Sequence, residues 1–468
     1  MGIDTKIKRL FVVMMENRSF DNLLGWSDLS GTTPDGASTS ADTLMGKPIF
    51  TNRSVDPYTN QTISHPIAGI APYRLCFDPG HEFADVLLQL CHDKLGGIDI
   101  DCTSDTVSLP GGDYPPMVSD PNDLGYAECL QRHGVDVDKA FTCFKPDQLP
   151  VIHFLARQFA VCDRWFSSMP GPTLPNRFFA LAGQSWGIDH SPDSLQVVSA
   201  SFFNNKFGDG QSLFSSLSPN EWLVVYGDTP VSWSIKGTAN HIDRFMHQSD
   251  FFTSMEIGGI DEDVRFVFIE PHYSPLDGFA GGESMHPKGD VRNGEAFIRD
   301  VYESFRQSRY WEDSALLITF DEHGGFFDHV IPDDTNAFPP LAPTGAGQKH
   351  GFRFDRYGVR VPAIIVSPYV RAGTIDHTVY DHLSIAKTLQ EIARPDGGPG
   401  LLNSARFEAA ASFSKVFTLA QARTMDSIPD CPGAVPLDDA AATRSGPTAE
   451  ILKAMTGPDA ALDGASPS

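Results

Sequence analysis

The chain contains the run Leu10-Phe11-Val12-Val13-Met14-Met15, followed at once by Glu16-Asn17-Arg18-Ser19-Phe20-Asp21, and a second run, Ala315-Leu316-Leu317-Ile318-Thr319-Phe320, followed by Asp321-Glu322-His323-Gly324-Gly325. Neither apolar run alternates with polar residues. Such runs are typical of strands covered on both faces, as in parallel α/β sheets. These sheets place their chemistry just beyond the carboxyl ends of the strands. The sequence therefore predicts two buried strands that each end at a group of polar side chains.

The polar residues after the two strands predict a metal site. If the strands are neighbours, four side chains converge on one crevice: Glu16, Asn17, Asp321 and Glu322. Three carboxylates packed together repel one another unless a cation lies between them. We therefore expect a bound cation, and a metal site in such a crevice indicates an enzyme.

The rest of the chain predicts an α/β fold with a mostly parallel central sheet flanked by helices. Apolar runs at 159–162, 223–226, 264–269 and 362–366 are strand-like, and helical segments are expected at 82–91, 149–158, 294–306 and 380–392. Alternation of strands and helices favours a parallel sheet. Long irregular pieces are expected at 28–75, 103–125, 271–290 and 332–352. We predict one catalytic domain with insertions over 1–430 and an Ala/Pro/Gly-rich tail over 431–468, with a short helix at 449–455.

Composition excludes some classes of partner. The formal net charge is −25, which disfavours nucleic acid and steady attachment to anionic membranes, because both depend on Lys and Arg. We expect at most transient contact with a membrane surface. No run reaches the ~18 apolar residues of a membrane span. The basic residues before residue 10 imitate a signal peptide, but a first strand is expected there. The seven cysteines fit disulfides or reduced thiols equally, so cytoplasmic and secreted locations both remain open.

Thr173 is the candidate nucleophile. It lies in Pro172-Thr173-Leu174-Pro175-Asn176-Arg177, before an apolar helical stretch. One interpretation is a capped helix, with Thr173 as the N-cap and Pro175 in the first turn. The other is that Thr173 attacks phosphorus, activated by a divalent cation and beside a helix N-terminus that suits a phosphate. Arg177, one turn later, either braces the site or reaches a phosphate oxygen.

Four segments in order resemble one family: 16–21, 172–177, 321–330 (Asp-Glu-His-Gly-Gly-Phe-Phe-Asp-His-Val) and 358–362 (Gly-Val-Arg-Val-Pro). Together they are similar to the phosphoesterase family of bacterial and plant non-specific phospholipases C and the related acid phosphatases. The resemblance extends from about residue 8 to about residue 395. It implies an alkaline-phosphatase-like α/β fold. It also implies metal ligation by Glu16, Asn17, Asp321 and Glu322, with Thr173 as nucleophile and further ligand. Hard oxygen ligands favour Ca²⁺, Mg²⁺ or Mn²⁺ over Zn²⁺.

Histidines supply the expected acid–base chemistry. His81 resembles a family histidine that contacts the phosphoryl group. His286 lies in a motif that usually reads Asp-His-Pro-x-His-Asp, but Met285 and Gly289 replace the flanking Asp and the second His. We predict that His81 or His286 protonates the departing alkoxide while the other hydrogen-bonds the phosphoryl oxygens. His323 is expected beside the metal carboxylates, and we group it with Arg177 as a substrate-binding candidate.

Structural roles are expected for three further histidines, His329, His377 and His382.

The sequence thus predicts a metal-dependent phosphodiesterase of phospholipase C type that acts through a phosphothreonine intermediate and takes a phospholipid or a small phosphoester. An acid phosphatase with the same residues is the close alternative. A sulfatase is more distant, because Thr173 cannot be converted to the aldehyde that sulfatases use. A non-catalytic binding protein would need missing ligands or a missing nucleophile. Head group, metal identity and oligomeric state remain open.

Overall fold

A computed structural model describes residues 6–191, 207–208, 211–332 and 348–437. Its centre is a ten-stranded sheet in the order β12-β11-β13-β1-β14-β15-β10-β16-β2-β3. The strands are β12 (Phe245–His247), β11 (Trp222–Tyr226), β13 (Phe266–Glu270), β1 (Arg9–Met15), β14 (Ser314–Phe320), β15 (Ala363–Val366), β10 (Ala160–Cys162), β16 (Thr374–Asp376), β2 (Ser30–Thr32) and β3 (Ser38–Ser40). The predicted mostly parallel sheet is confirmed, with β15 antiparallel to both of its neighbours.

The two strands quoted from the sequence are neighbours at the middle of the sheet. Every residue of β1 and β14 is buried, as continuous apolar runs predict. Their parallel register pairs Met15 with Phe320. Glu16 and Asp321 therefore leave the sheet side by side, as the sequence predicted.

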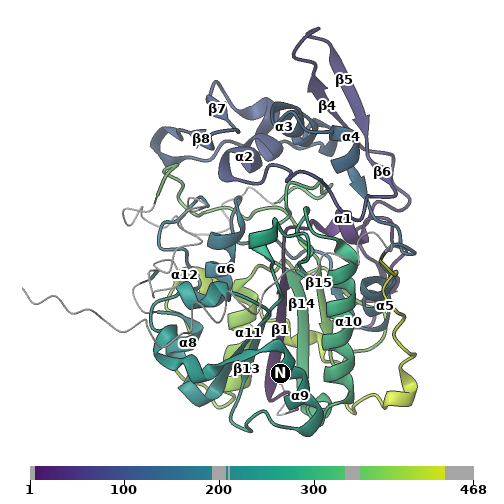
Figure 1. The fold of residues 1–468 in the computed structure, drawn as a ribbon, viewed down its shortest axis with the longest axis vertical. Helices are drawn as coiled ribbons and strands as arrows, with labels where there is room; N and C mark the ends of the chain where they lie inside the picture. The colour runs from purple at the N-terminus through teal and green to yellow at the C-terminus, as the bar shows by residue number, and fades with distance from the viewer. Residues whose placement is uncertain (1–5, 192–206, 209–210, 333–347, 438–468) are drawn as a thin grey trace, which may run out of the picture.

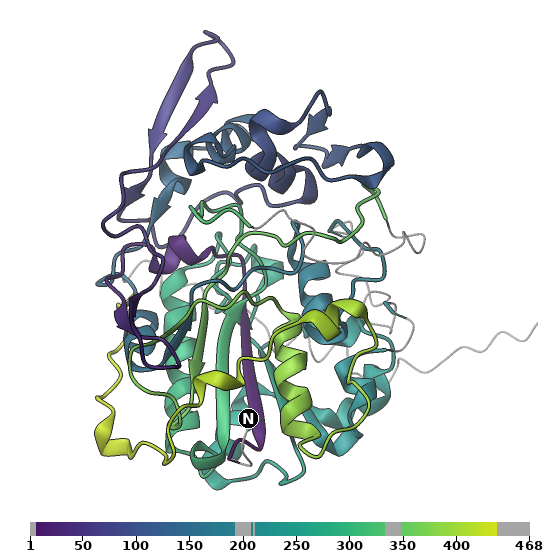
Figure 2. The ribbon, with the colours of Figure 1, turned by 180° about the vertical axis from the view of Figure 1, so that it is seen from behind.

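Helices cover both faces of the sheet. Figures 1 and 2 view the molecule from opposite sides, and α10 (Val291–Gln307) lies in front of the sheet in one and α11 (Leu383–Ala393) in the other. The remaining α-helices are α1 (Phe20–Leu24), α2 (Phe83–Cys91), α3 (Tyr126–Arg132), α4 (Val137–Ala140), α5 (Pro150–Gln158), α6 (Thr173–Ala182), α8 (Leu213–Ser216), α9 (Gln248–Ile257) and α12 (Ala405–Ala409). The expected helix at 380–392 begins three residues late, because Tyr380 forms a parallel bridge with Trp165.

A cap lies over the end of the sheet toward which β1 runs (Figure 1). It contains α2, α3, α4 and three two-stranded pieces, of which the hairpin of β4 (Thr51–Val55) and β5 (Thr62–Pro66) projects furthest. The others pair β6 (Ala68–Gly69) with β9 (Thr142–Cys143) and β7 (Ile100–Asp101) with β8 (Thr106–Val107). The expectation that 28–75 is irregular is therefore wrong in part. These strands escaped the sequence analysis because most of the hairpin is exposed and carries no apolar run.

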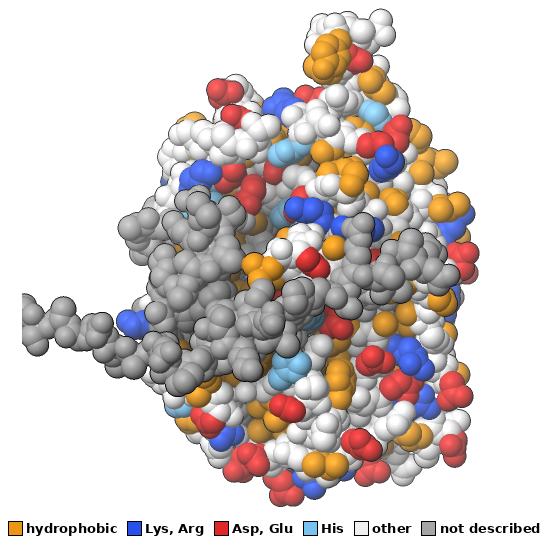
Figure 3. All heavy atoms as spheres, in the orientation of Figure 1, with side chains coloured by type: hydrophobic (Ala, Val, Ile, Leu, Met, Phe, Trp, Pro, Cys, Tyr) orange, Lys and Arg blue, Asp and Glu red, His pale blue; other side chains and the backbone are white. Residues whose placement is uncertain are grey.

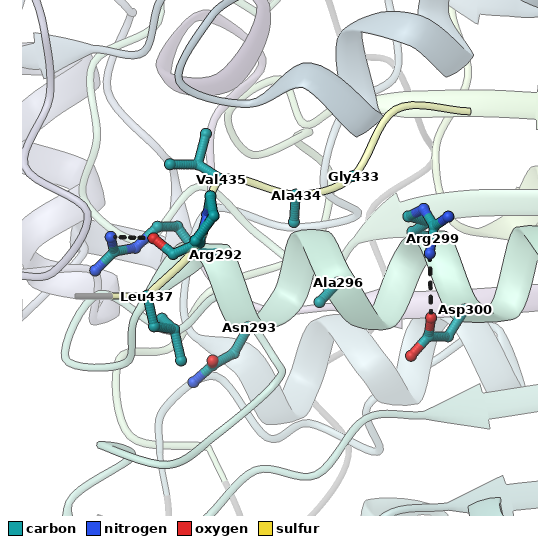
Figure 4. Close-up of a pocket in the computed structure, with 10 residues that line it drawn as sticks. Arg292, Asn293, Ala296, Arg299, Asp300, Gly433, Ala434, Val435 and Leu437 are labelled. Carbon is teal, nitrogen blue, oxygen red and sulfur yellow. Dashed lines mark hydrogen bonds and ion pairs between the residues drawn. The ribbon is translucent and has the colours of Figure 1, made fainter. Parts of the chain in front are cut away.

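The described part of the C-terminal segment runs along α10. The backbone carbonyl of Pro436 accepts a hydrogen bond of 2.8 Å from Arg292. Figure 4 shows a pocket of about 250 Å³ between this segment and α10, and none of the predicted site residues lines it. The boundary near residue 430 stays a prediction, and the expected helix at 449–455 lies outside the described residues.

The surface and the cysteines add two observations. Acidic and basic side chains are interspersed over the face in Figure 3, despite the net charge of −25. The seven cysteines are unpaired; Cys76 is exposed and the other six are buried.

A buried histidine in α5 predicts how stability depends on pH. Burial lowers the pKa of His153 to about 3, whereas an unfolded chain has a histidine pKa of about 6.5. Below pH 6.5 the unfolded state therefore binds a proton at His153 that the folded state does not bind. The free energy of unfolding falls as the pH falls. We expect His153→Gln to weaken this pH dependence by about 3 kcal/mol between pH 7 and pH 4. Urea unfolding of both proteins at each pH measures it, and parallel curves would contradict it.

Candidate active site

Asn17 lies at the centre of the site. Its backbone has φ of 59°, a left-handed conformation that asparagine tolerates better than most residues. Its backbone N–H donates to Asp321 Oδ1 at 3.0 Å. Its side-chain amide donates to Glu322 Oε1 and, at 3.3 Å, to Thr173 Oγ1, and lies 3.3 Å from His81 Nε2. The side chain thus contacts three residues that are far apart in the sequence, His81, Thr173 and Glu322.

The glycine turn after Glu322 allows this close approach. Gly324 has φ of +64°, and a Cβ atom there would lie 2.2 Å from the backbone oxygen of Asn17. A larger residue would push the two strand ends apart. The turn also lets the backbone N–H of Gly324 donate to Glu322 Oε2 at 2.7 Å, which orients this carboxylate.

Thr173 is the first residue of α6, and Pro172 occupies the N-cap position. The interpretation of Thr173 as the N-cap is therefore wrong by one residue. Its hydroxyl makes no capping bond and faces the Asn17 amide instead. Thr173 is only partly buried, so its oxygen is both held in place and accessible.

Arg177 is fully buried and points at the predicted ligand residue Asp321 from one turn further along α6. Its Nε donates to Asp321 Oδ2 at 3.0 Å, and a terminal nitrogen donates to the carbonyls of Met15 at 3.0 Å and Met14 at 3.3 Å. The other terminal nitrogen lies 3.9 Å from Glu270 Oε2. Arg177 thereby joins α6 to the ends of three neighbouring strands.

Two oxygens of the predicted ligand set are available to a divalent cation. Glu16 Oε2 and Asn17 Oδ1 are buried and have no hydrogen-bond partner among the described residues. Burial raises the pKa of Glu16 to about 8, and Asp321 adds to the effect by repulsion. Burial and repulsion from Glu322 likewise raise the pKa of Asp321 to about 6. A cation bound between these carboxyl groups would supply positive charge and stabilise their ionised forms.

His81 faces the site through Nε2, because Nδ1 lies 2.7 Å from the carbonyl of Pro79. Its Nε2 is 3.9 Å from Glu322 Oε1. Burial lowers the pKa of His81, but Glu322, Asp78 and Glu82 outweigh burial and raise the pKa to about 10. While Glu322 carries no cation, the imidazole is therefore protonated at neutral pH and can donate a proton.

His286 lies behind His81. Its Nε2 is 3.3 Å from Asp78 Oδ2, and its ring stacks on Phe279 with centroids 3.8 Å apart. Burial lowers the pKa of His286 despite the neighbouring carboxylate of Asp78. The two histidines therefore differ in charge at neutral pH, which suits different roles.

His323 supports Glu322. Its Nδ1 is 3.3 Å from Glu322 Oε2, and its Nε2 is 2.7 Å from Gln89 Oε1 on α2. Gln89 was not among the predicted site residues. The available signal was a single polar residue within the apolar run Val86-Leu87-Leu88-Gln89-Leu90.

His382 also supports the site, although only a structural role was expected. Burial lowers the pKa of His382 to about 4, so the ring is neutral. Its Nδ1 accepts from Trp165 Nε1 at 3.3 Å, which leaves the hydrogen on Nε2 for the backbone oxygen of Asp321 at 2.6 Å. No sequence pattern links residues 321 and 382, because the contact is made by folding alone.

Asp21, Asp328 and His329 form a second buried cluster, which is satisfied internally. Arg360 Nη2 is 3.0 Å from Asp21 Oδ1, and Arg360 Nε is 3.0 Å from Asp328 Oδ1. His329 Nδ1 is 2.6 Å from Asp21 Oδ2. The motifs at 16–21, 321–330 and 358–362 are therefore joined by one buried arginine as well as by the site itself.

Residues 7–222 and 264–394 match the Phosphoesterase family. The chain belongs to this family. It is accordingly a phosphoric ester hydrolase, and the matched ranges include all of the predicted site residues.

Individual relatives agree with the family assignment. Non-specific phospholipase C6 of Arabidopsis thaliana is 32% identical over 82% of this chain and 68% of its own length. Phospholipase C B of Mycobacterium tuberculosis is 26% identical over 82% of this chain and 73% of its own length.

A solved protein of the alkaline phosphatase superfamily from Vibrio parahaemolyticus is also similar, at 13% identity over 53% of this chain and 60% of that chain, with a TM-score of 0.31. A likeness this slight adds nothing about function. Among the described residues, no helix has the length and apolar character that a membrane span requires.

Proposed function

We propose that this phosphoesterase is a metal-dependent phosphodiesterase of phospholipase C type. The proposal rests on the position of the Thr173 hydroxyl. This hydroxyl makes no helix-capping hydrogen bond, and its oxygen lies 3.3 Å from the Asn17 amide nitrogen, among the acidic residues and His81. The named phospholipases C among the relatives favour a phospholipid diester as substrate.

The predicted cation ligands are Glu16, Asn17, Asp321, Glu322 and Thr173. A divalent cation bound there would neutralise phosphoryl charge and favour the ionised threonine oxygen. The donor set contains only oxygens, which favours Ca²⁺, Mg²⁺ or Mn²⁺. Arg177 holds the Asp321 carboxylate in place, and His323 holds the Glu322 carboxylate in place. Substrate contacts by Arg177 and His323 stay predictions.

The proposed reaction has two steps. In the first, Thr173 Oγ1, ionised after its hydroxyl proton has passed to solvent, forms a bond to phosphorus, the phosphorus–oxygen bond to diacylglycerol breaks, and His81 gives its proton to the departing alkoxide. In the second, neutral His81 takes a proton from water, the resulting hydroxide attacks the phosphothreonine, and the phosphorylated head group and the ionised Thr173 oxygen are released. His286 Nε2 faces Asp78, and its Nδ1 accepts from the backbone N–H of Lys288 at 3.3 Å, so a hydrogen bond from His286 to a phosphoryl oxygen stays a prediction.

An acid phosphatase using the same residues is the second candidate, because the same two steps could be carried out on a phosphomonoester. Rates of diacylglycerol release from phosphatidylcholine and of phosphate release from p-nitrophenyl phosphate, measured with one enzyme preparation, separate the two. The phospholipase proposal expects the higher kcat/KM on the diester. A higher kcat/KM on the monoester would reject it in favour of the phosphatase.

A further inference from the structure

The cap contains a cluster of potential metal ligands that the proposed reaction does not use. One ligand atom from each of Asp85, Cys129 and His133 lies within 4.8 Å of the other two. Cys129 Sγ is 3.4 Å from Asp85 Oδ1, and His133 Nε2 is 2.7 Å from the same oxygen. Asp85 and Cys129 are buried, and the His133 side chain is 23% exposed. The three ligand atoms are therefore already close together, and solvent reaches the group at His133.

Two helices present these side chains. Cys129 lies in α3 and His133 directly follows it, a spacing of four residues that places both on one face. Asp85 lies in the first turn of α2, where its Oδ2 also accepts the backbone N–H of Glu82 at 3.0 Å. A second thiol lies nearby, because Cys102 Sγ, just after β7, is 4.0 Å from the backbone oxygen of Ala84, the residue before Asp85.

We propose that Asp85, Cys129 and His133 bind a zinc ion, with the fourth position open to water beside the partly exposed His133. Thiolate, imidazole and carboxylate are all ligands that zinc takes in proteins. Soft sulfur ligands also distinguish this site from the all-oxygen set around Thr173, which suits a harder cation. The cluster of Asp21, Asp328 and His329 is a weaker candidate, because Arg360 already neutralises it.

A zinc ion here would fix the position of His81. It would tie α3 to the first turn of α2, and His81 lies two residues before that helix. The adjacent Gln89 continues the connection, since its Nε2 donates to the carbonyl of Gly80 at 2.7 Å and to Cys129 Sγ at 3.5 Å. The proposed zinc acts through this packing and takes no part in the chemistry.

Cobalt substitution tests the proposal independently of catalysis. The reduced, metal-free protein is loaded with Co²⁺, and the near-ultraviolet absorption band of cobalt bound to thiolate is recorded. The Thr173 site contributes no such band, because its donors are oxygens. We expect the band in the wild type, its complete loss in Cys129→Ser, and a weaker band in His133→Gln. Cys76→Ser removes an exposed thiol of the same region and should leave the band unchanged.

Zinc analysis and thiol titration complete the experiment. We expect Cys129→Ser and His133→Gln to bind less Zn²⁺ than Cys76→Ser, and Zn²⁺ to raise the melting temperature of the wild type but not of His133→Gln. His133 is partly exposed, so its variant remains informative if Cys129→Ser fails to fold. Absence of the cobalt band from the reduced wild type, or its survival in His133→Gln at full strength, would overturn the proposal. A disulfide between Cys102 and Cys129 in the protein as purified would also overturn it.

Discussion

We expect Thr173→Ala to lower kcat by on the order of 10⁴-fold or more, because the variant lacks the oxygen that we propose bonds to phosphorus. The fold should survive, since the hydroxyl makes no helix-capping bond and we expect a change in unfolding free energy within about 1 kcal/mol. Steady-state hydrolysis of a phosphocholine diester and urea unfolding measure the two quantities.

Thr173→Ser is the matched control. It keeps the hydroxyl and should retain substantial activity, whereas the alanine variant should not. Near-wild-type turnover by Thr173→Ala would remove this residue as the nucleophile. Equal loss in both variants would show that the methyl group, and hence packing at the start of α6, matters more than the hydroxyl.

We expect Asp321→Asn to lower metal content and activity together, with a fall in kcat/KM on the order of 10³-fold, because the proposed cation would supply several kcal/mol of transition-state stabilisation. The substitution removes one negative charge from a fully buried carboxylate that lies 3.0 Å from Arg177. Elemental analysis after gel filtration, paired with kinetics on the same sample, measures both effects.

Glu270→Gln controls for the loss of a buried charge near Arg177. Glu270 is equally buried and lies 3.9 Å from Arg177, but its oxygens are occupied by Val231 N, the backbone and hydroxyl of Ser232, and the Tyr273 hydroxyl. It should keep its metal. Unchanged metal stoichiometry in Asp321→Asn would contradict the ligand assignment, and equal metal loss in Glu270→Gln would attribute the effect to the local fold.

The centre of the fold could be predicted because burial leaves a direct mark on sequence. Strands covered on both faces need continuous apolar residues, and β1 and β14 carry them. The direction of a strand has no such effect on its sequence, so residues 362–366 did not indicate that β15 is antiparallel to β14. In the cap, α2 was expected at 82–91, but the hairpin of β4 and β5 was not, because it is mostly exposed and carries no apolar run.

The site could be predicted as far as it follows from strand ends and motifs. Glu16 and Asp321 emerge side by side because the register of two strands places them there. Gln89 and His382 could not be found, because each meets the site through a contact between distant segments. The position of Thr173 was misplaced by one residue, because a proline at 172 is compatible with either helix start.

A crystal structure of the enzyme with phosphate, with the metal identified by anomalous scattering, tests the proposed site most directly. We predict one divalent cation in contact with oxygens of Glu16, Asn17, Asp321 and Glu322, and the Thr173 oxygen directed at phosphorus. A cation bound elsewhere, or a Thr173 hydroxyl turned away from the phosphate, would refute the account.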